Sequence, residues 1–135
     1  MICLDTNAVI ALLNKKSDGL RARLDGMRVD GEVIAVSTIV YFELWFGAEK
    51  SARRTLNAAL IEGLAAGPMA TLPFDYEDAM EAGHIRVGLE RRGRPIGAYD
   101  LLIAAQARRR GALLVTANLG EFSRVEGLRV ENWMA

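Results

Sequence analysis

The chain has 135 residues, of which 51% are hydrophobic and 25% charged. This length and balance predict one compact domain over residues 1–135 and exclude a largely disordered protein. The formal net charge is zero, with 17 basic and 17 acidic residues, which argues against a protein that coats nucleic acid nonspecifically.

Short apolar runs alternate with segments of helical periodicity along the whole chain. The first strand ends at Asp5, and Thr6 and Asn7 can cap the helix after it. In the first half, we predict a strand at 2–4, helices at 6–13 and 18–27, a strand at 33–36, helices at 39–46 and 51–66, and a weak strand at 69–74. A long helix follows Asp75, with Tyr76, Ala79, Met80, Gly83 and Val87 on one face. After it we predict a loop at 93–97, a helix at 98–110, and strands at 113–116 and 128–130.

The predicted strands are continuous apolar runs rather than alternating ones, which is typical of strands buried on both faces. Together with the strand–helix order, this predicts a three-layer α/β/α fold around a mostly parallel sheet of four to five strands. Ligands bind at the carboxyl ends of the strands in such folds. Polar clusters follow two of these strands, at 5–7 and 116–118, and neighbouring strands would bring them to one crevice.

The single cysteine, Cys3, and the single histidine, His84, limit the chemistry. They exclude an internal disulfide, a cysteine zinc site and any mechanism that needs two histidines. The N-terminus lacks the basic start of a signal peptide, and no apolar stretch approaches the ~20 residues that span a membrane. We therefore expect a cytoplasmic protein without membrane association.

Two acids stand in apolar surroundings in the first half of the chain. Asp5 directly follows a buried strand, where it is either a site residue or a simple helix cap. Glu43 lies in a helix that is apolar nearly all round, so we expect that helix to be largely enclosed. A carboxylate there needs a metal ion or a buried salt bridge with an arginine.

Further polar groups lie in the second half. Asp100 shares a helix stripe with Ile103, Ala104 and Ala107 and is predicted to point inward; the alternative is a first-turn acid that only meets the helix dipole. Asn118 and Glu121 follow the 113–116 strand. They are either site residues, or Asn118 is a simple turn residue and Glu121 a surface acid.

Several inward carboxylates at one sheet edge would repel each other strongly unless a cation joined them. Mg²⁺ suits a site of few carboxylates and several waters, and such a site can activate water for attack on phosphorus. The scarcity of histidine and cysteine favours Mg²⁺ or Mn²⁺ over zinc. This predicts metal-assisted hydrolysis of a phosphodiester.

Arginines cluster on both sides of the Asp100 helix. Arg91, Arg92 and Arg94 precede it, and we expect them to lie near the crevice and hold phosphates of the substrate. The run 108–110 ends it, where cations favour the helix dipole.

Five segments follow one another along the chain: Leu4-Asp5-Thr6-Asn7, Phe42-Glu43-Leu44 with Gly47, the segment 97–105, Val115-Thr116-Ala117-Asn118 with Glu121-Phe122, and the segment 125–133. In this order they resemble the PIN-domain family, and the last of them resembles the tail of its VapC-type toxins. The match runs from Ile2 to Trp133.

The resemblance implies an Mg²⁺- or Mn²⁺-dependent endoribonuclease that is the toxin of a type II toxin–antitoxin pair. Asp5, Glu43 and Asp100 would form the acidic metal site, supported by Thr6, Asn7 and Thr116. Many family members carry a fourth acid where this chain has Asn118. Asparagine can still bind a hard cation through its carbonyl but brings no charge, and Glu121 can supply the missing carboxylate. Because the second metal site loses the charge at position 118, we expect one tightly bound metal.

The resemblance also implies partners: a small antitoxin that blocks the acidic pocket and a second copy in a homodimer. DNA would be contacted only through the antitoxin. The aromatic side chains of Tyr41, Trp45 and Phe46 are then either part of such a surface or plain core packing.

Two other functions remain open from the residues. One is a phosphatase with Asp5 as nucleophile, although the second acid usual two residues later is Asn7 here. The other is a non-catalytic PIN-like binding module, favoured only by Asn118.

Overall fold

The computed structural model describes residues 1–134 and contains a five-stranded parallel sheet in the order β3-β2-β1-β4-β5. All four strand pairs are parallel. The predicted three-layer α/β/α class is therefore confirmed. The strands are β1 Ile2–Leu4, β2 Ile34–Ser37, β3 Ala70–Leu72, β4 Leu113–Val115 and β5 Arg129–Glu131.

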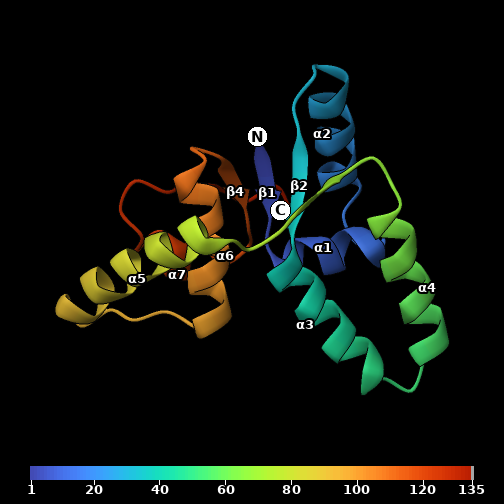
Figure 1. The fold of residues 1–135 in the computed structure, drawn as a ribbon. Helices are drawn as coiled ribbons and strands as arrows, with labels where there is room; N and C mark the ends of the chain where they lie inside the picture. Colours follow the sequence, from blue (N-terminus) through green and yellow to red (C-terminus); the bar gives the residue numbers. More distant parts are fainter. Residues whose placement is uncertain (135) are drawn as a thin grey trace.

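Helices connect these strands, and two pairs of helices pack closely: α3 with α4 and α5 with α6. Figure 1 shows the two pairs on opposite sides of the strands, with α1 and α2 beside the first pair. The helices are α1 Thr6–Leu13, α2 Asp18–Val29, α3 Thr38–Glu49, α4 Arg54–Ala65, α5 Tyr76–Arg91, α6 Ala98–Arg109 and α7 Leu119–Phe122.

The central strand β1 positions the functional end of the sheet. Leu4, its last residue, is in register with Val36 of β2 and with Val115 of β4. The chains leaving β1 and β4 therefore start beside each other, which brings Asp5 and Thr116 to the same edge. The expectation that the two polar clusters share one edge is confirmed.

Several local boundaries differ from those expected. Asp5, not Thr6 or Asn7, is the N-cap of α1. The helix expected at 51–66 begins only at Arg54, and the strand expected at 69–74 ends at Leu72, since Pro73 has no N–H for a ladder. The short helix α7 was not anticipated.

The long helix α5 turns a different face inward than its apolar spacing suggests. It buries Asp78, Ala82, Ile85 and Leu89, whereas Tyr76 is 79% exposed and Met80 is 61% exposed. Asp78 can face inward because Arg109 and Arg110 of α6 neutralise it. Within residues 1–134, no helix combines the length and apolarity needed to cross a membrane.

Candidate metal and phosphodiester site

Asp5 stands at the end of β1 and is almost fully buried. Its Oδ1 accepts the backbone N–H of Ala8 at 2.8 Å, which caps α1, and its Oδ2 accepts the hydroxyl of Thr116 at 2.6 Å. Burial raises the pKa of Asp5, and the nearby Glu43 raises it further. Asp5 thus caps α1 and is held in place at both oxygens.

Glu43 points from α3 toward the start of α1. Its Oε1 accepts the hydroxyl of Thr6 at 2.8 Å. The partner of this carboxylate is therefore a hydroxyl rather than an arginine. The helix is less enclosed than expected, because Phe42 and Phe46 lie on its exposed side while Tyr41 is buried and Trp45 is half-buried.

Asp100 lies in the first turn of α6 and is half-buried. Burial, together with the carboxylates of Glu121, Glu43 and Asp5, raises its pKa to about 6. Contacts link the same acids: Glu43 accepts from Thr6, the residue after Asp5, and Asp100 and Glu121 both lie near Gly97. The four acids, at the end of β1 and on α3, α6 and α7, therefore face one region and form one cluster.

Glu121 is held firmly at the edge of this cluster. Its Oε1 accepts the backbone N–H of Gly97 at 2.5 Å, and its Oε2 accepts the amide of Asn118 at 2.7 Å. These hydrogen bonds, Gly97 first, lower the pKa of Glu121. A Cβ on Gly97 would lie in ordinary van der Waals contact, 3.5 Å from oxygens of both Asp100 and Glu121, so the two carboxylates approach the same loop residue.

Asn118 serves as a support for Glu121 in this geometry. Its amide donates to Glu121, and its backbone N–H donates to the hydroxyl of Thr116 at 2.9 Å. Thr116 is itself fully buried and donates to Asp5. Thr116 therefore links Asp5 to the segment that carries Glu121.

The donor set fits a hard divalent cation. Within residues 1–134, no three carboxylate, thiolate or imidazole groups are close enough to enclose a metal ion. Mg²⁺ does not need such a cage, since it binds through one or two carboxylates and keeps several waters. The mutual repulsion that raises the pKa of Asp100 is what a cation would relieve. Burial raises the pKa of Cys3 to about 11, so it remains a thiol.

The other predicted residues lie farther out. Asn7 is exposed on the first turn of α1, and Arg91 and Arg94 are exposed beside the loop before α6. Arg92 contacts Glu126 at 3.2 Å and donates to the backbone carbonyl of Arg124 at 2.9 Å. Its guanidinium is thus partly used within the protein.

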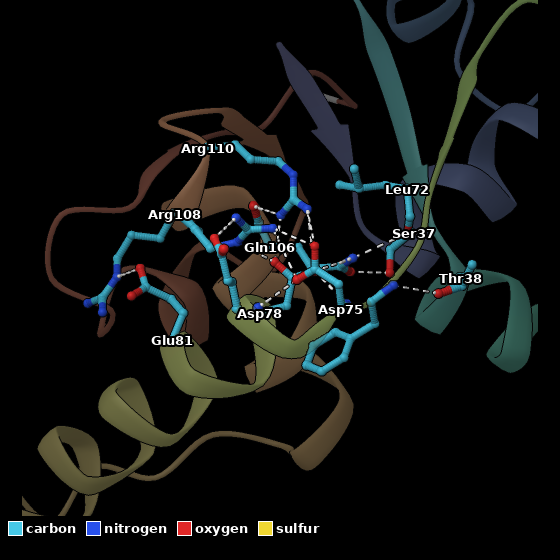
Figure 2. Close-up of polar contacts among 12 residues, drawn as sticks. Ser37, Thr38, Leu72, Asp75, Asp78, Glu81, Gln106, Arg108 and Arg110 are labelled. Carbon is cyan, nitrogen blue, oxygen red and sulfur yellow. Dashed lines mark hydrogen bonds and ion pairs between the residues drawn. The ribbon is translucent and has the colours of Figure 1, made fainter.

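The arginines at the end of α6 have a larger role than the helix dipole. Asp78 of α5 is fully buried and receives Arg109 Nε and Arg110 Nη1, each at 2.7 Å. Gln106 extends the contacts to the carbonyl of Leu72 and to Ser37 on β2 (Figure 2). We call Asp78, Gln106, Arg109 and Arg110 the α5–α6 network. The sequence offered one indication that Asp78 has a structural role, the capping box that it forms with Asp75 at the start of α5.

Comparisons with known proteins match nearly the whole chain. The family model described as the PIN domain matches residues 2–128. A tRNA(fMet)-specific endonuclease VapC of Salmonella typhimurium is 38% identical over 130 residues, and one of Shigella flexneri is 40% identical; each alignment covers 96% of both chains. VapBC2 of Rickettsia felis, solved with a DNA fragment from its promoter, is 34% identical, with a TM-score of 0.91 over 98% of this chain and 99% of that chain.

Proposed function

Because this chain belongs to the PIN-domain family, we propose that it is a metal-dependent endoribonuclease and the toxin of a bacterial toxin–antitoxin pair. The observation that carries this proposal is the cluster of Asp5, Glu43, Asp100 and Glu121, which hydrogen bonds and the approach of two of the acids to Gly97 hold together. The chain is also similar over 96% of its length to tRNA(fMet)-specific endonucleases. The acids supply a site for a cation, and the relatives supply the class of substrate.

Asp5 and Asp100 would hold Mg²⁺ or Mn²⁺, and Glu43 and Glu121 beside them would supply further carboxylate oxygens. When bound, such a cation lowers the pKa of water and stabilises the charge that develops at phosphorus. Asn118 contributes through its hydrogen bond to Glu121 rather than as a ligand, because its amide nitrogen faces that carboxylate.

The supporting residues keep each carboxylate in place. Thr116 fixes one oxygen of Asp5 and the Ala8 N–H fixes the other, so this acid cannot rotate freely. Thr6 restrains Glu43 in the same way. Asn7, exposed near the start of α1, orients a water or the substrate. Such outer contacts set the geometry and basicity of metal ligands.

RNA reaches the site past the loop at 93–97, where Arg91 and Arg94 meet phosphates and Arg92 mainly orders the neighbouring loop. The chain acts as one PIN-like domain in the cytoplasm. A small antitoxin restrains it, and DNA is bound only through that antitoxin. The chain is similar to VapBC structures that were solved with DNA bound. A homodimer is the assembly we expect.

Cleavage of a panel of tRNAs and single-stranded RNAs by the antitoxin-free protein tests this function, with and without Mg²⁺ or Mn²⁺. We expect metal-dependent cleavage and a loss of about 10²-fold or more in Asp100→Asn. Glu90→Gln, an exposed acid on α5 paired with Arg86, is the matched control and should cleave normally. A folded protein that cuts no RNA and binds neither cation would refute the proposal.

A further inference from the structure

Three aromatic side chains form an exposed cluster on α3 and α6: Phe42, Phe46 and Tyr99, which are 50%, 57% and 47% exposed. The ring centroids of Phe42 and Tyr99 are 5.4 Å apart and tilted by 59°, and those of Phe42 and Phe46 are 6.5 Å apart and nearly parallel. The three rings thus make one continuous apolar patch, which we call the aromatic cluster.

The aromatic cluster adjoins the acidic site. Phe42 directly precedes Glu43, and Tyr99 directly precedes Asp100. The Phe42–Tyr99 contact joins the two helices that carry these acids. From this contact the patch runs outward along α3 through Phe46 to Lys50, whose Nζ lies 4.6 Å from the Phe46 ring centre.

Exposed aromatic rings beside a candidate phosphodiester site are suited to bind the base of an unpaired nucleotide, and not only its phosphate. Exposed rings stack on nucleobases with little dependence on sequence, at about 1–3 kcal/mol per base. A chain of zero net charge lacks the broad positive field that usually binds RNA. The arginines at the end of α6 are moreover committed to carboxylates of α5, so stacking can supply affinity that charge does not.

We propose that the aromatic cluster stacks one or two unpaired nucleobases next to the phosphodiester that is cut, while Lys50 contacts the backbone beyond them. This inference rests on the proposed ribonuclease function and deepens it, because it makes the preferred substrate a single-stranded or looped segment. Lys50 supplies the positive charge that a phosphate beside the stacked bases requires.

The test compares Phe42→Leu and Tyr99→Leu with Tyr76→Leu, a matched change at an exposed ring on α5. Steady-state cleavage of a single-stranded RNA should give a KM raised about 5- to 100-fold for the first two variants. Their kcat should stay within about twofold, and the control should match wild type. A 2-aminopurine RNA titrated into the Asp100→Asn protein should be quenched on binding, and less so when Tyr99→Leu is added.

Sedimentation of each variant separates this role from a contact with a second copy of the chain. We expect the same assembly mass for wild type and the leucine variants. An unchanged KM, or a loss of assembly in those variants, would overturn the inference. Wild-type protein without cleavage would instead refute the ribonuclease function, so the two failures are distinguishable.

Discussion

The two ends of α6 hold buried acids in opposite electrostatic surroundings. At its start, Asp100 faces three other carboxylates, and its pKa rises to about 6. At its end, Asp78 of α5 is more deeply buried. Burial alone would raise the pKa of Asp78, yet Arg110, the Asp75 N–H and Arg109 hold it well below its usual range.

The comparison distinguishes an acid whose charge the protein itself neutralises from acids whose charges it leaves facing one another. The α5–α6 network neutralises its acid with hydrogen-bonded arginines, so the protein itself completes the arrangement. The acidic cluster leaves like charges facing each other, a repulsion that a bound cation would relieve. Clustered groups with perturbed pKa values and no internal partner are typical of functional sites.

Replacing the neutralised acid should give the largest effect on stability. Asp78→Asn leaves Arg109 and Arg110 without their buried carboxylate, and we expect the free energy of unfolding to fall by about 3 kcal/mol. Urea unfolding measures this loss. RNA cleavage below the unfolding transition should stay near wild type, because the network lies away from the acids.

Glu77→Gln is the control, since Glu77 contacts the same Arg109 but is exposed. If Asp78→Asn lowers the free energy of unfolding no more than Glu77→Gln does, the α5–α6 network does not hold α5 and α6 together.

At the start of α6, beside the acidic cluster, removing the hydroxyl of Thr116 should have a smaller effect, and it should lower activity rather than stability. Thr116→Val keeps the side-chain shape but removes the donor to Asp5 and the acceptor for the Asn118 N–H. We expect kcat to fall about 10- to 100-fold. Thr116→Ser should recover most of it, because serine restores the hydroxyl. Equal losses in both variants would point to packing rather than hydrogen bonding.

The smallest effect is a difference in pH dependence between the two ends. Because the folded-state pKa of Asp100 is raised to about 6 from 3.8, the folded protein binds more protons than the unfolded chain between these values. Stability of the metal-free protein should therefore fall as pH rises through this window. Asp78 has a lowered pKa, so its contribution is present above about pH 4 and is lost on acidification.

Urea unfolding of metal-free wild type and Asp100→Asn between pH 4.5 and 7.5 checks this sign. The advantage of the variant should grow with pH and level off above about 6.5. Metal affinity of the wild type should rise over the same range, since protons compete with the cation. A pH-independent difference would mean that Asp100 does not titrate in this window.

The sequence by itself determined the layered parallel sheet and indicated all four clustered acids, Glu121 as a candidate that either completes the site or lies on the surface. Buried strands appear as uninterrupted apolar runs, and parallel strands end at a common edge. Those two local facts place Asp5 and Thr116 at the same edge of the sheet. The pairing of β1 with β4, which makes them neighbours there, was decided by the tertiary structure. Asp100 and Glu43 were indicated because an acid within an apolar stripe is costly to bury.

Only the tertiary structure decided the inward face of α5, the partners of Arg109 and Arg110, and the support that Asn118 gives Glu121. Asp78 and Arg110 are 32 positions apart, and nothing in the local periodicity of either helix specifies that they meet. Periodicity orients residues within one element, whereas the neutralisation of a buried charge depends on which distant element packs against it.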